Sequence, residues 1–295
     1  MGLIVLLLEG LALACAVAIA YTAWLLTHPP RRTYATAVSR SRPGDPGELS
    51  PRRSFETWML RSRDLNLPVW DIPGDLATGP TIILTHGWGD SRIGALARVH
   101  ALAPVARRIV AWDMAGHGEA QGRCSLGTRE TDDLLALIDQ VRDPASTLVL
   151  FGWSLGAGVS IAAAASRAGQ IAGVIAEAPY CIPMTPARNV LRRRSLPHAF
   201  NLPPALAMIG ISAGVGPGFT GFDRAKLAAR LACPLLVVHG ELDDISPPED
   251  GRRIAEAGRG ELLLLPDGGH AGLWTEPRHA QVCTEAVARF LSGLR

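Results

Sequence analysis

Residues 148–160 read LVLFGWSLGAGVS: four apolar residues run into a serine between two glycines, and small residues follow. The apolar run is typical of a buried strand, and the small residues are typical of a closely packed helix. A serine in G-x-S-x-G at a strand-to-helix junction predicts a sharp turn that exposes the hydroxyl of Ser154. Gly152 and Gly156 would be needed there because side chains would collide in the turn. The chain has 31 glycines, so the pentapeptide alone decides little and its surroundings must be read with it.

The rest of the chain shows the rhythm of an α/β protein. Short apolar runs that are continuous rather than alternating indicate strands covered on both faces. Helical patterns lie between them, which favours βαβ units and a mainly parallel sheet with helices on both faces. Two further runs, 55–60 and 67–72, precede the first parallel unit and fit antiparallel edge strands. The predicted buried strands are 81–85, 109–112, 148–151, 173–176, 235–238 and 261–265, and the predicted helices are 129–141, 155–168 and 280–294.

One region breaks this rhythm. Residues 180–233 are rich in proline and glycine, and we interpret them as a lid inserted over the carboxyl ends of the strands. The run Arg192, Arg193 and Arg194 lies in this lid. We expect it to form a solvated face, and contact with anionic lipid headgroups is the sharper alternative.

A serine hydroxyl becomes a nucleophile only when a base takes its proton, so a histidine and an orienting acid are expected later in the chain. The sequence VVHGELDDISP (237–247) follows the next-to-last strand, and LLLLPDGGH (262–270) follows the last. With these motifs the chain resembles the α/β-hydrolase family. The resemblance implies that Asp243 is the acid and His270 the base, in the family's order Ser, Asp, His. Asp244 is adjacent and stays open as the alternative acid.

The front of the domain carries two more matching motifs. The sequence HGWGD (86–90) is similar to the family's oxyanion loop, and DMAGHG (113–118) resembles a turn of monoacylglycerol-lipase-like and lysophospholipase-like members. The resemblance therefore spans about residues 55–294. It implies a hydrolase fold in which the backbone N–H groups of Trp88 and Leu155 form the oxyanion hole. Such donors can each contribute roughly 3 kcal/mol to transition-state stabilisation.

The implied activity is hydrolysis of an ester or similar acyl bond through an acyl-enzyme intermediate, of the carboxylic ester hydrolase type. The expected partner is a small lipophilic acyl substrate, and this chemistry needs no metal or cofactor. A serine-aminopeptidase-like peptidase, an acyltransferase and a haloperoxidase share the same motifs. A membrane-tethered binding module with a silent triad is the alternative from another class.

The N-terminus indicates attachment to a membrane. Residues 3–26 are almost wholly apolar, with Glu9 the one charge, and a span needs about 20 such residues. Arginines follow the run and none precedes it, which favours a single-pass anchor with a cytoplasmic domain. The alternative is a cleaved signal peptide, because residues 18–20 read AIA. We predict an anchor over residues 1–28, a flexible linker over 29–53 and one hydrolase domain over 54–295.

Charge and cysteine content exclude other classes. The net charge of +2 does not favour a nucleic-acid partner. The five cysteines are scattered without a C-x-x-C pair, which argues against a disulfide framework and a zinc site.

Overall fold

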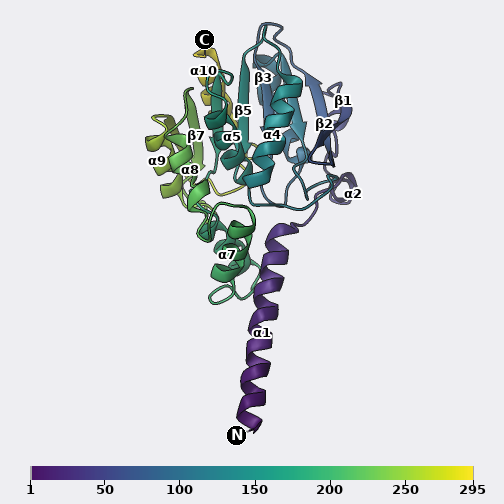
Figure 1. The fold of residues 1–295 in the computed structure, drawn as a ribbon. Coiled ribbons are helices and arrows are strands. Elements are labelled where there is room, and N and C mark those ends of the chain that lie inside the picture. The colour runs from purple at the N-terminus through teal and green to yellow at the C-terminus, as the bar shows by residue number, and fades with distance from the viewer. Residues whose placement is uncertain (1, 295) are drawn as a thin grey trace.

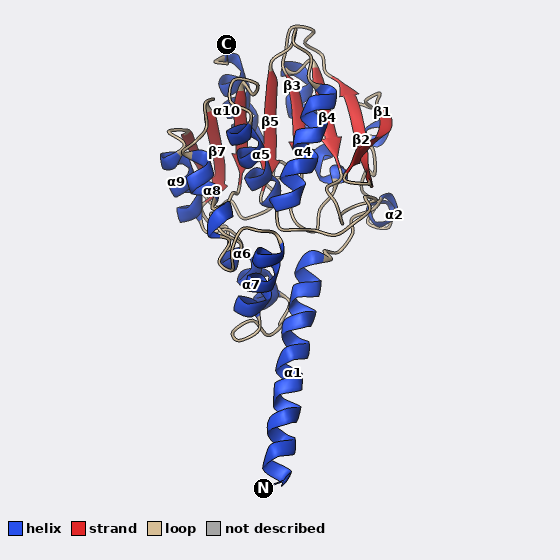
Figure 2. Cartoon of the chain, in the orientation of Figure 1, coloured by secondary structure: helices blue, strands red, loops and turns tan. Residues whose placement is uncertain are grey.

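The computed structural model describes residues 2–294, and its centre is a sheet of eight strands in the order β1-β2-β4-β3-β5-β6-β7-β8. Strands β3 to β8 run parallel, while β1 pairs antiparallel with β2 and β2 pairs antiparallel with β4 (Figures 1 and 2). Every predicted strand is present, including the two antiparallel edge strands. The strands are β1 Glu56–Ser62, β2 Leu65–Pro73, β3 Thr81–Thr85, β4 Arg108–Trp112, β5 Leu148–Trp153, β6 Gly173–Glu177, β7 Leu235–Gly240 and β8 Glu261–Leu265.

Helices cover both faces of this sheet, as the continuous apolar strands require. Neighbouring residues of a strand face opposite sides, so Ile83 belongs to one core cluster and Ile82 and Leu84 belong to the other. Figure 2 shows α4 and α5 in front of the strands. One face carries α3 Leu96–Leu102 and α10 Pro277–Ser292, and the other carries α4 Thr128–Val141, α5 Leu155–Ser166, α8 Arg224–Ala228 and α9 Pro248–Ala257.

The predicted lid region lies between β6 and β7. It contains α6 Met184–Arg193, α7 Leu202–Ser212 and the short turn η4 Thr220–Phe222. The predicted lid, residues 180–233, includes α8. This helix instead packs against α5 and α9 and belongs to the helical layer over the sheet. Only the part up to about residue 222 therefore extends beyond the strand ends.

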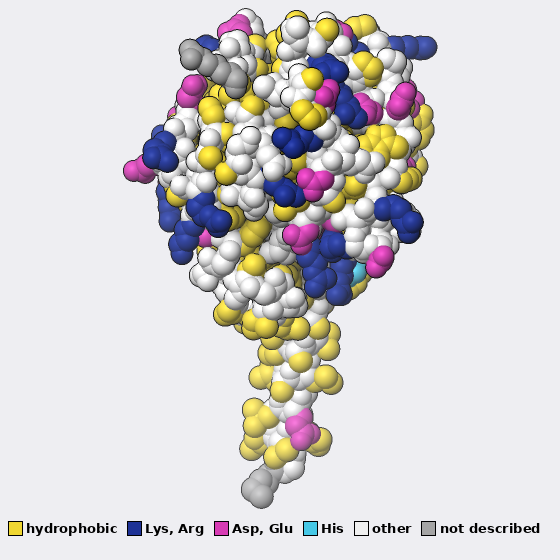
Figure 3. Space-filling view, turned by 45° about the horizontal axis from the view of Figure 1, so that its top comes forward, with side chains coloured by type: hydrophobic (Ala, Val, Ile, Leu, Met, Phe, Trp, Pro, Cys, Tyr) yellow, Lys and Arg dark blue, Asp and Glu magenta, His cyan; other side chains and the backbone are white. Residues whose placement is uncertain are grey.

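The N-terminal helix α1, Gly2–Thr27, projects from the domain at the end where the lid lies (Figure 1). It is long and apolar enough to cross a membrane, although a signal sequence passes the same test. Figure 3 shows hydrophobic side chains along the length of its visible face, with one acidic side chain near the N-terminal end. Its last turns pack against α7, so the helix is attached to the lid as well as to the chain that follows.

Residues 29–53 differ from the predicted flexible linker. They form α2 Tyr34–Val38 and the turn η1 Pro46–Glu48, and both Ala37 and Leu49 are buried in the core. The segment is also tied down by two arginines. Arg31 donates to the carbonyl oxygen of Ala120 at 2.7 Å, and Arg32 pairs with Asp90 at 2.8 Å. The composition of this stretch suggested disorder, but a few apolar anchors and cation contacts are enough to order it on the domain.

Candidate active site

The nucleophile candidate Ser154 lies at the junction of β5 and α5. Its backbone has φ 54° and ψ −115°, a sparsely populated conformation for a residue with a side chain. The N–H of Ser154 donates to the carbonyl oxygen of Glu177 at 2.8 Å, which fixes the turn to β6. Added Cβ atoms at Gly152 and Gly156 would each lie 2.1 Å from a backbone oxygen. The glycines are therefore required by close backbone approach, as the sequence indicated.

The structure brings the three predicted triad residues together. The Nε2 atom of His270 lies 3.1 Å from Oγ of Ser154, and its Nδ1 lies 2.8 Å from Oδ2 of Asp243. His270 comes from the loop after β8, and Asp243 comes from the loop after β7. Because parallel strands end at one edge of the sheet, residues distant in sequence meet there. The arrangement has the geometry of a nucleophile, a base and an orienting acid.

The carboxylate of Asp243 is held by four donors. Its Oδ1 accepts the backbone N–H groups of Ile245 and Ser246 at 2.9 and 2.8 Å. Its Oδ2 faces His270 and also Nε2 of His239, at 3.2 Å. Burial alone would raise the pKa of Asp243, but the hydrogen bonds from His239 and His270 hold it well below its usual range. Asp243 is therefore ionised at neutral pH.

The alternative acid, Asp244, points elsewhere. Its side chain is 58% exposed and lies 3.4 Å from the guanidinium of Arg193. It makes no contact with His270 among the hydrogen bonds of residues 2–294. The geometry thus favours Asp243 over Asp244 for the acid, as the family spacing implied.

The predicted oxyanion donors lie on either side of Ser154. Leu155 is the first residue of α5, so its N–H is at a helix N-terminus, where negative charge is stabilised. The loop that carries Trp88 crosses the serine closely, since a Cβ at Gly87 would lie 3.3 Å from the Ser154 Cβ. Within the part of the chain that the structure describes, neither the Leu155 N–H nor the Trp88 N–H has a protein acceptor. Both donors are free to meet a substrate oxygen.

The other motif histidines support loops. His86 accepts the backbone N–H of Met114 at 2.9 Å and donates to the carbonyl oxygen of Gly87 at 2.8 Å. His117 contacts the carbonyl oxygen of Ala115 at 3.1 Å. Burial lowers the pKa of His86 and lowers that of His117 further, so both rings are neutral at pH 7. They fix the loops after β3 and β4 rather than carry protons.

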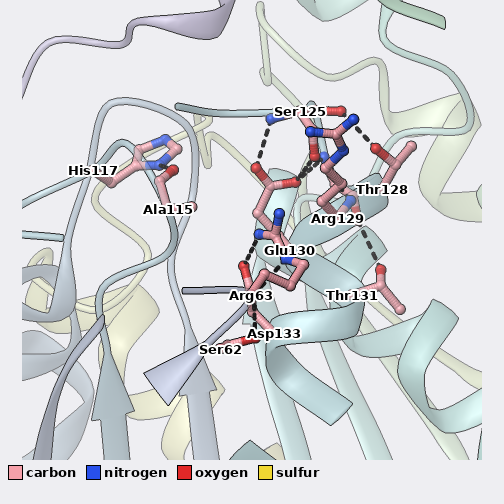
Figure 4. Close-up of polar contacts among 11 residues, drawn as sticks. Ser62, Arg63, Ala115, His117, Ser125, Thr128, Arg129, Glu130, Thr131 and Asp133 are labelled. Atoms are coloured by element: carbon pink, nitrogen blue, oxygen red, sulfur yellow. Dashed lines mark hydrogen bonds and ion pairs between the residues drawn. The ribbon is translucent and has the colours of Figure 1, made fainter. Parts of the chain in front are cut away.

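A second group of polar contacts fixes the loop that approaches the site from α4 (Figure 4). The carboxylate of Glu130 accepts the backbone N–H groups of Ser125 and Gly127 at 2.6 and 2.9 Å. One turn further along α4, Asp133 accepts from Nε of Arg63 at 2.9 Å. The two Glu130 contacts hold the backbone on either side of Leu126, which lines a cavity that also reaches Ser154.

Sequence reasoning missed a buried ion pair beside the site. Arg98 on α3 donates through Nε and Nη2 to Glu177 at the end of β6, at 3.0 and 2.6 Å. Trp274, four residues after His270, donates to the same carboxylate at 2.7 Å. The sequence signal for this ion pair was an acidic residue, Glu177, at the end of an otherwise apolar strand. The contact of His239 with Asp243 was also missed, and its signal was a histidine four residues before the acid. Neither pattern names its partner.

A cavity of about 290 Å³ opens over Ser154. Its wall is mostly apolar and includes Leu126, Tyr180 and Val190, with Arg193 and Arg194 contributing as well. Leu26 of α1 also lines it, and the Trp88 indole N–H donates to the Leu26 carbonyl oxygen at 2.9 Å. The end of the N-terminal helix is thus part of the wall, which the sequence did not indicate.

Two buried thiols and the arrangement of possible metal ligands can also be compared with the triad. Burial raises the pKa of the Cys181 and Cys283 thiols to about 12, so neither is a thiolate at neutral pH. Over residues 2–294, no group of three or more His, Cys, Asp or Glu side chains is arranged to hold a metal ion.

The mostly parallel sheet, the strained serine after β5, and the acid and histidine after β7 and β8 define the class: the protein has the α/β-hydrolase fold. The sequence profile described as "Alpha/beta hydrolase family" matches residues 82–285. The chain belongs to the alpha/beta hydrolase family. This confirms the predicted fold and the predicted resemblance.

Solved structures of similar fold include several enzymes. An esterase of Pyrococcus furiosus is 21% identical, with a TM-score of 0.69 over 91% of this chain and 98% of its own. A thermophilic esterase of Thermogutta terrifontis is 22% identical, with a TM-score of 0.58 over 81% and 98% of the two chains. A bromoperoxidase of Bacillus anthracis is 22% identical, with a TM-score of 0.59 over 81% and 100%. At these identities the likeness shows the shared fold.

Proposed function

We propose that the protein is a serine hydrolase that cleaves a carboxylic ester through an acyl-enzyme intermediate. The observation that carries this proposal is the chain of contacts from Oγ of Ser154 through His270 to Asp243, at 3.1 and 2.8 Å. The esterases among its structural neighbours agree with the proposal at the level of the fold. Family membership gives the same general expectation.

In this proposal His270 accepts the proton of Ser154 through Nε2 as Oγ attacks the carbonyl carbon. Asp243 fixes the ring with Nδ1 protonated and stabilises its positive charge. The N–H groups of Leu155 and Trp88 bind the oxyanion that develops. The imidazolium then gives its proton to the leaving alcohol, and water repeats both steps to release the acid.

The lining of the cavity supports a substrate with a lipophilic acyl group that binds there. Its wall over Ser154 is mainly apolar, from Leu26 and Leu126 to Tyr180 and Val190. Burial of methylenes against such a wall contributes about 0.8 kcal/mol each. We therefore expect p-nitrophenyl esters with an acyl chain to be hydrolysed faster than aminoacyl anilides.

We also propose that α1 is a retained single-pass anchor with the domain on the cytoplasmic side. Support comes from the arginines that follow the helix and from the packing of its last turns on the lid. The intact mass of the purified membrane form tests retention, since cleavage near residue 20 would remove more than half of α1. Protease protection in sealed inside-out vesicles tests the orientation.

The activity is tested with a fluorophosphonate probe and a panel of p-nitrophenyl esters of graded chain length, alongside aminoacyl anilides. Wild type should be labelled and should hydrolyse the esters, while Ser154→Ala should lose both. Ser166→Ala, at the far end of the same helix, is the matched control and should behave as wild type. A wild type that is folded yet neither labelled nor active would favour a silent binding module.

A further inference from the structure

The lid has a surface that is unusual for a water-exposed segment. Residues 196–222 contain no Asp, Glu, Lys or Arg, whereas about a quarter of residues in soluble domains are charged. Within this segment, large apolar side chains face outward: Phe200, Met208 and Ile211 are 54%, 53% and 64% exposed. A cluster of exposed apolar residues without charges among them marks a surface that contacts another apolar phase.

This surface lies beside α1. Asn201, which precedes α7, donates to Oγ1 of Thr22 at 2.6 Å, and both residues are buried. From that point α7 runs along α1, with Leu202, Leu206 and Ile209 buried in the same cluster as Leu26 (Figure 1). The helix with its exposed apolar face is therefore an extension of the surface of α1.

The length of α1 fixes the depth of the lid. Residues 2–14 are exposed on all sides, and burial against the domain begins at Cys15. The free part, residues 3–14, is only about 18 Å long at 1.5 Å per residue. A hydrocarbon core is about 30 Å thick. If α1 crosses a bilayer, about eight more residues, 15–22, must also lie in hydrocarbon. The part of α7 that packs beside them, beginning at the contact of Asn201 with Thr22, must lie at the same depth.

Three arginines lie at the end of the uncharged lid segment that is nearer the catalytic domain. Arg192, Arg193 and Arg194 are all exposed and immediately precede the uncharged segment. Basic residues at such a boundary are attracted to phosphate headgroups, by about 1 kcal/mol each near an anionic surface. Arg193 and Arg194 also line the cavity over Ser154, together with Leu26. The cavity rim is therefore at the boundary between the lid's basic end and α1.

The turn at the tip of the lid suits an apolar surrounding. The N–H of Val215 donates to the Gly210 carbonyl oxygen at 2.9 Å, and the N–H of Phe219 donates to the Gly216 carbonyl oxygen at 3.1 Å. The N–H of Gly221 donates to the Val215 carbonyl oxygen at 3.0 Å. Backbone donors that are paired within the segment lose little when water is removed.

We propose that α7 and the turn after it insert into the cytoplasmic leaflet beside α1, so that the cavity of Ser154 opens to the bilayer. The substrate is then a membrane-resident acyl lipid whose chain enters from the leaflet past Leu26, with its headgroup near Arg193 and Arg194. The substrate part of this inference rests on the proposed esterase function, and the insertion part rests on the proposed anchor α1.

Insertion is tested on the full chain in phosphatidylcholine nanodiscs. The fluorophore NBD is attached to Met208→Cys or Ile211→Cys, and to Met59→Cys as the control, since Met59 is 55% exposed on β1 at the far edge of the sheet. We expect doxyl-labelled lipids to quench NBD at 208 and 211, and aqueous iodide to quench it at 59. Iodide quenching at 208 and 211 would overturn the insertion. So would protection from both quenchers, which would indicate a protein partner on this face.

Lipid access is tested with Met208→Asp and Ile211→Asp against Met59→Asp. A carboxylate placed in hydrocarbon costs enough to withdraw the lid, so we expect at least about a tenfold loss in hydrolysis of 1-oleoylglycerol carried in the nanodisc. Fluorophosphonate labelling and hydrolysis of p-nitrophenyl acetate should not change. Equal 1-oleoylglycerol hydrolysis by all variants would refute entry from the leaflet. If the fluorophosphonate does not label the wild-type protein, the proposed esterase function is refuted, whatever the NBD experiment shows.

Discussion

The buried pair of Arg98 and Glu177 permits a quantitative prediction about stability. Their side chains are 7% and 4% exposed, and two hydrogen bonds join them. The Arg98 guanidinium also lies 4.0 Å from the centre of the Trp153 ring. Replacing Glu177 by Gln keeps the shape and an acceptor for Trp274, but it leaves the Arg98 charge buried without a counter-charge.

The expected cost follows from that charge. Breaking a buried ion pair by removing one partner costs about 3–5 kcal/mol in free energy of unfolding. At roughly 2 °C per kcal/mol for a chain of this size, Tm should fall by about 6–10 °C. The double variant Arg98→Met/Glu177→Gln has no unpaired charge and keeps an acceptor for Trp274, so it should be more stable than Glu177→Gln and close to wild type.

The measurement is thermal and urea unfolding of the full chain in detergent, followed by tryptophan fluorescence. The matched control is Asp139→Asn, which breaks the pair with Arg167, at 2.7 Å and with side chains 58% and 32% exposed. That variant should lose no more than about 1 kcal/mol. If Glu177→Gln unfolds like Asp139→Asn, or if the double variant is no better than the single one, the buried pair does not have the assigned role.

Three further predictions concern the site itself. Asp243→Asn should lower kcat/KM for p-nitrophenyl butyrate by about 10⁴-fold, whereas Asp244→Asn should stay near wild type; equal losses would refute the assignment of the acid. Because the Asp243 pKa is depressed below its ordinary value of 3.8, its carboxylate stabilises the fold above that pH and loses this contribution as the pH falls. Urea titrations between about pH 7 and pH 3 should therefore show the stability gap to Asp243→Asn narrowing in acid, and a constant gap would contradict this. Gly156→Ala places a Cβ 2.1 Å from a backbone oxygen and should abolish ester hydrolysis by the detergent-extracted chain. Gly169→Ala, with open space around it, should keep hydrolysis and cost only about 1–2 kcal/mol of stability for its φ of +77°.

Much of the fold could be predicted because its signals are local. Continuous apolar runs identify strands covered on both faces, and their alternation with helices gives the parallel sheet. The serine turn was also readable, since G-x-S-x-G between a strand and a helix has few other uses. The positions of Asp243 and His270 came from the family resemblance. The geometry places the His270 ring against Ser154 and the Asp243 carboxylate against His270, as that resemblance implied.

The features that could not be predicted from the sequence depend on contacts between segments that are distant along the chain. The linker prediction for residues 29–53 failed because composition does not reveal that Arg32 has Asp90 as a partner 58 positions away. Likewise, an apolar N-terminal helix has the same pattern whether it stands alone or packs on α7. The roles of Leu26 in the cavity wall and of Arg98 beside the site arise from such packing.

The ordered segment between α1 and β1 has a practical consequence for anyone seeking a water-soluble version of this protein. Starting the polypeptide at residue 54 would strip Ala37 and Leu49 from the interior and leave Asp90, whose other oxygen accepts the Trp153 indole N–H at 3.1 Å, without its arginine. Starting it at residue 29 would keep those contacts but remove the leucine that closes one side of the cavity. For the ester hydrolysis proposed above, we therefore expect a chain that starts at residue 29 to accept a broader range of acyl lengths than the intact polypeptide, on which specificity should be profiled.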